Sequence, residues 1–138
     1  MAPELTTTFL DLAVGHYRLA LKTDCVVGIL ADQPALPTLR FREAEVPLVD
    51  LSSTFSGRAR AQVPFVVAVE ARSGRVLLGV DTVGHLRLAA DARLLPLPGF
   101  GLARPDLFSG VLRDGQGLLM LLSPEALPTL SAAKSGAI

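Results

Sequence analysis

Few residues of this sequence suggest a catalytic role, and the clearest is an aspartate at the end of an apolar stretch. Asp81-Thr82-Val83 follows the apolar run of residues 77–80. Two carboxylates held about 3 Å apart, one from each of two copies of a chain, can share a proton and activate water. A glycine after the acid would let the backbone approach such a pair, but Val83 occupies that place. We therefore expect Asp81 to be a capping or surface residue at a strand end.

The two histidines, His16 and His85, are the other candidates for acid–base or metal chemistry. A metal site would need further ligands from Asp24, Asp81 or Asp91, and no spacing indicates that they converge. The sequence contains neither a Gly-x-Ser-x-Gly nucleophile elbow nor a glycine-rich phosphate loop after a strand. We predict a protein that is not an enzyme and has no metal or cofactor. A small dimeric enzyme resembling aspartic proteases, built around Asp81, is the catalytic alternative.

Composition narrows the class of partner. The chain has 138 residues and no net charge, since 13 basic residues balance 13 acidic ones. The absence of a basic excess argues against nucleic acid as a partner. No run reaches the roughly 18 apolar residues of a membrane-spanning helix, and no secretory signal is visible. Cys25 is the only cysteine and is expected to be a small buried hydrophobe. We predict a cytoplasmic protein that does not insert into membranes.

Short apolar segments separated by turn residues predict an all-β protein. Alternation with a period of two gives the first two strands an inner face each, made of Leu10, Leu12 and Val14, then Tyr17, Leu19 and Leu21. Gly15-His16 would form the turn between them, and Ala20 would point outward. Further strands are expected over residues 25–30, 46–51, 65–71, 75–83, 110–113 and 116–122.

The remaining segments are predicted to be turns, loops and a short helix. Residues 31–37 should be a turn-rich connection, and residues 89–93 a single helical turn. Residues 56–62 should form a polar loop in which Arg58 and Arg60 are solvated. Ser123-Pro124 predicts the start of a short C-terminal helix, and residues 131–138 should be a loose tail.

Two apolar sets exceed what one small barrel needs. They are Val26, Val27, Ile29 and Leu30 in one segment, and Leu39, Phe41, Leu86 and Leu88 elsewhere. Gly28, inside the first set, predicts a bulge or a close approach by another backbone. The sets either pack two lobes against each other or line an exposed groove for a partner helix, and both can hold at once. A β-barrel that binds a small ligand or a peptide is a further alternative.

The order of these segments resembles the CheW-like domain, which couples chemoreceptors to the histidine kinase CheA in bacterial signalling arrays. The family's Val-Pro-hydrophobic-Val-Asp-Leu motif is matched by Val46-Pro47-Leu48-Val49-Asp50-Leu51, and its Gly-to-Val-Asp-x-Val motif by Gly79-Val80-Asp81-Thr82-Val83. The remaining matches are Phe9-Leu10-Asp11-Leu12, Tyr17-Arg18-Leu19-Ala20-Leu21, Leu95-Pro96-Leu97-Pro98, Gly110-Val111-Leu112, residues 118–122 and Pro124-Glu125-Ala126-Leu127.

The resemblance implies one domain over residues 1–138, formed by two SH3-like five-stranded barrel lobes that share a core and by a short C-terminal helix. It implies a non-catalytic adaptor without a cofactor. Its partners would be the chemoreceptor signalling tip, in an apolar groove between the lobes, and the regulatory domain of a CheA-type kinase or another CheW-like protein, at the lobe edges. The candidate protein-binding residues are Val27, Gly28, Ile29, Leu39, Phe41, Arg42, Glu43, Leu86 and Leu88.

The sequence departs from the family before its Val-Pro strand. That segment is shortened, and Phe41-Arg42-Glu43 stands where the family has Leu-Arg-Gly, so only the arginine is retained. Gly28 takes the place of an acid that the family often carries in its third strand. These departures indicate a variant function, in which an accessory CheW-like protein binds the receptor or a sister adaptor but not the kinase.

Overall fold

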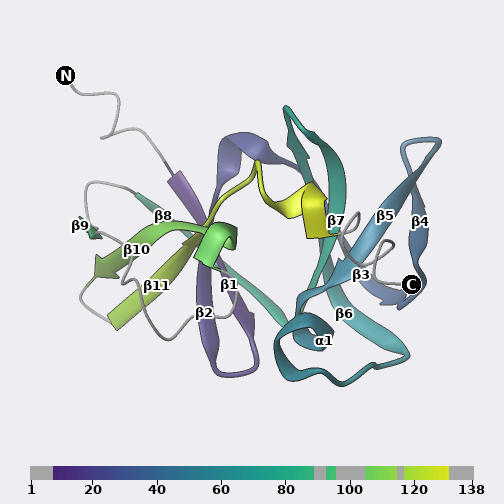
Figure 1. The fold of residues 1–138 in the computed structure, drawn as a ribbon, viewed down its shortest axis with the longest axis horizontal. Helices are drawn as coiled ribbons and strands as arrows, with labels where there is room; N and C mark the ends of the chain where they lie inside the picture. Colours follow the sequence, from purple (N-terminus) through teal and green to yellow (C-terminus); the bar gives the residue numbers. More distant parts are fainter. Residues whose placement is uncertain (1–7, 89–92, 96–104, 115–116, 131–138) are drawn as a thin grey trace.

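The computed structural model describes residues 8–88, 93–95, 105–114 and 117–130, and these form two β-sheets that lie side by side (Figure 1). The first lobe contains a six-stranded sheet in the order β8-β1-β2-β11-β10-β9. Its strands are β1 (Thr8–Val14), β2 (Tyr17–Lys22), β8 (Thr82–Leu88), β9 (Arg93–Leu95), β10 (Phe108–Asp114) and β11 (Gly117–Leu122). Neighbours in this sheet are antiparallel except for β11 and β2, which are parallel.

The second lobe contains a five-stranded sheet in the order β3-β6-β7-β5-β4. Its strands are β3 (Val26–Pro34), β4 (Thr38–Phe41), β5 (Ala44–Asp50), β6 (Gln62–Ala71) and β7 (Gly74–Val80). Only β5 and β7 pair in parallel. The second lobe is therefore inserted into the first, between β2 and β8. The all-β fold of two lobes is confirmed, and one lobe gains a sixth strand, the three-residue β9.

The two lobes share one apolar core. Its buried residues come from the first lobe, the second lobe and the C-terminal segment, and include Leu12, Leu19, Leu21, Val67, Leu78, Val80, Leu122 and Leu127. Each lobe also has a cluster of its own, around Leu39, Phe41 and Leu77 in the second and around Phe9 and Leu119 in the first. Removal of this apolar surface from water is the main force that holds the two sheets together.

The β1–β2 hairpin is confirmed, with Gly15 at a φ of 59° in its turn. The assignment of faces in β2 was partly wrong. Ala20 is fully buried, because it packs in the first-lobe cluster with Phe9 and Leu119. Tyr17 is 54% exposed, because it lies at the start of β2, beyond the shared core.

Strand β3 is longer than the sequence predicts. The chain makes a 3₁₀ turn, η2 (Thr23–Cys25), before β3, and β3 then pairs with β6 as far as Pro34. The turn-rich connection is thus confined to a few residues before β4. The next segment is a β-hairpin of β4 and β5, whose turn residues Arg42 and Glu43 have φ angles of 51° and 66°. Positive φ at both turn positions is the pattern of a type I′ turn, which matches the twist of the strands.

A helix that the sequence did not predict follows β5. Helix α1 (Leu51–Ser56) begins where the Asp50 side chain accepts a hydrogen bond from the Ser52 N–H, and ends at Gly57 in the left-handed conformation. The polar loop is accordingly shorter, and β6 already begins at Gln62. Serine and threonine dominate α1 and are weak helix formers, so its caps rather than its interior stabilise it.

The C-terminal segment begins its helix later than expected. Residues 124–126 form a turn, with the Ala126 N–H bonded to the Ser123 carbonyl, and the helix covers residues 127–130. The Glu125 carboxylate accepts the N–H groups of Arg72 and Ser73 at the β6–β7 turn, which ties the segment to the second lobe. The predicted β10–β11 hairpin is confirmed. The helical turn at 89–93 and the tail at 131–138 lie wholly or largely outside the described residues.

Candidate protein-binding surface and the polar cluster between the lobes

The two most distinctive sequence motifs meet in the second lobe. Strands β5 and β7 pair in parallel, with Asp50 opposite Gly79. A β-carbon on Gly79 would lie 3.0 Å from Asp50 Oδ1, 3.1 Å from Asp50 Cα and 2.8 Å from a methyl carbon of Val63. Gly79 of the second motif thus makes room for Asp50 of the first, because only glycine leaves space for the Asp50 carboxylate.

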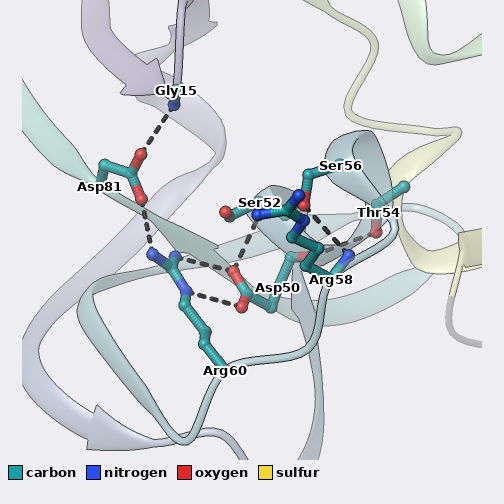
Figure 2. Close-up of polar contacts among 8 residues, drawn as sticks. All are labelled: Gly15, Asp50, Ser52, Thr54, Ser56, Arg58, Arg60 and Asp81. Carbon is teal, nitrogen blue, oxygen red and sulfur yellow. Dashed lines mark hydrogen bonds and ion pairs between the residues drawn. The ribbon is translucent and has the colours of Figure 1, made fainter.

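The Asp50 carboxylate belongs to a polar cluster at the seam between the lobes (Figure 2). Arg60 Nε and Nη2 donate to Asp50 Oδ2 and Oδ1, both at 2.8 Å, and Arg60 Nη1 donates to Asp81 Oδ1 at 2.7 Å. The other oxygen of Asp81 accepts the Gly15 N–H at 2.7 Å. Asp50 is the most enclosed member, with a side chain only 8% exposed. The prediction that Arg60 is solvated was wrong, because the loop turns its guanidinium onto two carboxylates.

The pKa shifts in this cluster keep its groups charged, which does not suit acid–base catalysis. Burial alone would raise the pKa of Asp81, but the hydrogen bonds from Gly15 and Arg60 outweigh it, and the net pKa is lowered. The hydrogen bonds to Asp50, followed by those to Asp81, raise the pKa of Arg60 against the effect of burial. The two carboxylates therefore share a guanidinium rather than a proton. Asp81 is a capping residue at the break between β7 and β8, as the sequence predicted.

Cys25 also has a structural role rather than a reactive one. Cys25 is buried, and its Sγ donates to the Lys22 carbonyl. Burial, followed by the charge of Asp24, raises the pKa of this thiol to about 11, so it is a protonated, unreactive group at neutral pH. Within the described ranges, no three His, Cys, Asp or Glu side chains are grouped to hold a metal ion.

The candidate binding residues of the second lobe lie where its two edge strands meet. Val27, Gly28 and Ile29 are on β3, and Leu39 and Phe41 are on β4. Ile29 is 47% exposed, whereas Leu39 and Phe41 are buried in the second-lobe core. The surface that a partner can touch is thus made by β3, and the β4 side chains support it from inside.

Arg42 closes the gap between these two edges. Its Nη2 donates to the Val27 carbonyl at 2.6 Å, and its guanidinium carbon lies 5.1 Å from the centre of the Phe41 ring. This bond satisfies a carbonyl that would otherwise be open at the edge of the sheet. Glu43 is exposed in the hairpin turn next to Arg42, with a left-handed φ. Arg42 is therefore both an exposed charge and a structural contact, which the sequence did not indicate.

The last two candidates, Leu86 and Leu88, belong to the other lobe. They lie on β8, at the edge of the first-lobe sheet, where their backbones pair with Leu10 and Thr8. The structure therefore gathers the β3, β4 and hairpin candidates at one place and puts these two on a different sheet. Sequence reasoning did not single out Asp50 and Arg60 as partners, and the available signal was an aspartate at a strand end two residues before Ser52.

The bulge predicted at Gly28 is confirmed, but the group that approaches Gly28 closely is the Phe41 side chain rather than another backbone, and this contact supports a stability prediction. The β3–β6 register shifts between Val26 and Gly28, and a β-carbon on Gly28 would lie 2.9 Å from the Phe41 ring. Because Phe41 is buried and cannot move freely, Gly28→Ala should lower the free energy of unfolding by about 2 kcal/mol. Urea denaturation measures this change. Adding Phe41→Leu should recover part of the loss, and a double variant that is merely additive would contradict this cause.

The chain is an all-β protein of two fused lobes, with the polar cluster at the seam between them. The family model of the CheW-like domain matches residues 9–131, and the chain therefore belongs to the CheW-like domain family, whose members are non-catalytic scaffolding adaptors of chemotaxis. The structure is similar to the crystal structure of the scaffolding protein TtCheW from Thermoanaerobacter tengcongensis, with a TM-score of 0.72 and 15% sequence identity. That match covers 88% of this chain and 87% of the other.

No curated protein matches the sequence. At 15% sequence identity, the similarity to TtCheW shows a shared fold. Within the described part of the chain, no helix is long and apolar enough to cross a membrane.

Proposed function

We propose that this protein is a cytoplasmic adaptor that couples a chemoreceptor signalling tip to a CheA-type histidine kinase. The observation that carries the proposal is the outer surface of β3, where Ile29 is about half exposed and Val27 is partly buried beside the charged Arg42-Glu43 turn. An apolar residue framed by charges is the usual pattern of a docking surface for a helix. Family membership supports receptor and kinase as the partner classes.

The energetics of such docking would come from a small number of residues. Covering Ile29 removes apolar surface from water at roughly 25 cal/mol per Å². The exposed charges of Arg42 and Glu43 would add orientation and association rate more than affinity, because exposed charges at a rim are well solvated. Leu39 and Phe41 would act by holding β4 and Arg42 in place.

The test is a titration of the full chain with a receptor signalling-tip fragment and, separately, with a kinase regulatory domain. We expect both to bind. Ile29→Asp should weaken receptor binding at least tenfold, because it places a charge in the buried centre of the contact. Leu118→Asp is the matched control, since Leu118 is 57% exposed but lies on β11 of the other lobe. Equal affinities of both variants would remove the β3 surface from the receptor site.

The second candidate function is an accessory adaptor that binds the receptor or a sister CheW-like protein but not the kinase. The compact β4–β5 hairpin favours it, because its turn is only Arg42 and Glu43, and Arg42 is engaged with the Val27 carbonyl. In the same titration, receptor binding without kinase binding would support this candidate. Binding to neither fragment would contradict the coupling function and the receptor-binding form of the second candidate, and a titration with a sister CheW-like protein would then test its other form.

A further inference from the structure

The polar cluster at the seam joins three parts of the molecule that are distant in sequence. Asp50 ends β5 of the second lobe, Asp81 lies where the chain crosses from β7 to β8, and Gly15 is in the β1–β2 turn of the first lobe. Arg60, from the loop before β6, bonds to both acids, and Asp81 bonds onward to Gly15 (Figure 2). The cluster is thus a continuous polar connection from one lobe to the other.

This connection differs in kind from the shared core. Apolar burial is non-directional, and a core of Leu and Val can be repacked with modest loss of stability. Charge-assisted hydrogen bonds are short and directional, and a guanidinium that bonds two carboxylates fixes their relative positions. With Arg60 removed, Asp50 and Asp81 would repel each other across the seam. The cluster therefore constrains geometry that the core alone leaves less defined.

A second contact crosses the seam at the same end of the molecule. The Tyr17 ring, at the start of β2, lies 5.1 Å from the Phe55 ring of α1, at an angle of 59°. Helix α1 packs on β5 and β7 of the second lobe, and Asp50 caps its first turn. Asp50 thus positions both the guanidinium of Arg60 and the helix that carries Phe55.

We propose that Arg60 fixes the angle between the two lobes. This inference concerns the fold itself and holds whether or not the protein is a chemotaxis adaptor. If a partner touches both lobes, the fixed angle means that the two halves of its binding surface are already oriented before it binds. Pre-ordering of this kind lowers the cost of binding.

The test compares the unmodified chain with Arg60→Gln and Asp81→Asn by residual dipolar couplings of backbone amides. Couplings from β1 and β2 report on one lobe, and couplings from β5, β6 and β7 report on the other. We expect each lobe to keep its own structure while their relative orientation changes, and the Gly15 amide to exchange with solvent at least tenfold faster. Asp81→Asn keeps the Asp50–Arg60 pair, so it remains informative if Arg60→Gln does not fold.

Arg58→Gln is the matched control, because Arg58 is an exposed arginine of the same loop whose backbone N–H, rather than its guanidinium, bonds to Ser56. It should leave the orientation and the Gly15 exchange rate unchanged. One orientation common to all variants, with unchanged Gly15 exchange, would overturn the inference and show that the apolar core alone sets the angle. Neither readout uses a receptor or a kinase, so failure here is distinct from failure of the proposed function.

Discussion

Gly79→Ala should lower the free energy of unfolding by about 3 kcal/mol, at the upper end of the range for overpacking a core. The added methyl group would meet Val63 and Asp50 at 2.8–3.1 Å, and one of the atoms is the Asp50 α-carbon. That backbone is held in the parallel β5–β7 pair, so it cannot move away without breaking ladder hydrogen bonds. Since Gly79 is not among the residues with positive φ, the cost is steric rather than conformational.

Thermal unfolding followed by circular dichroism measures this change, with an expected drop in Tm of about 10 °C. Gly57→Ala is the matched control. Gly57 has a φ of 75°, and no atom lies within 4 Å of the place that a β-carbon would take, so it tests conformational cost without a clash. We expect that control to cost about 1 kcal/mol. If Gly79→Ala proved as mild as Gly57→Ala, the close approach of the two motifs would not limit stability.

Asp50→Ala should cost about 3 kcal/mol for a different reason. The variant loses the cap of α1, worth about 1 kcal/mol, and charge-assisted bonds to Arg60, worth about 2 kcal/mol. Asp50 is 7% exposed, so water does not readily replace the lost bonds. The substitution also leaves the Arg60 guanidinium with Asp81 as its carboxylate partner across the seam.

Equilibrium urea denaturation compares this variant with Asp50→Asn, which keeps an oxygen for the Ser52 N–H and should lose roughly half as much. Asp24→Ala, at an exposed aspartate in η2, should change stability by no more than about 0.5 kcal/mol. If Asp50→Ala lowered the free energy of unfolding by less than about 1 kcal/mol, water would replace the cap and the ion pair at little cost, which would contradict their structural role.

Much of the β structure follows from the sequence because each strand carries its own local signal. Leu10, Leu12 and Val14 define a face that is buried, and Asp11 and Ala13 between them are more exposed. Gly28 inside a strand predicted a bulge or a close approach by another backbone, and the structure has the bulge, with the Phe41 side chain close to it. Period-two alternation and glycine geometry act over a few residues, so no knowledge of the remaining chain is needed.

Local signals failed where contacts between distant residues determine the outcome. Helix α1 has a weak helix-forming sequence, and its N-terminal cap, Asp50, is equally consistent with the last residue of a strand. Ala20 was expected outside because alternation describes one covered face, whereas the first-lobe barrel covers both faces of β2.

The candidate site divides in the same way. Local patterns in the sequence predict the strand content, the two motifs that contain Asp50 and Asp81, and a chain without a recognisable catalytic pattern. The position of Arg60 between those two acids follows from the packing of the lobes, because a loop arginine has no local preference for a partner. Tertiary contacts also place Arg42 at Val27, where it closes the second lobe. The direction of a long charged side chain is set by charges and carbonyls that folding brings near it, and sequence spacing does not contain that information.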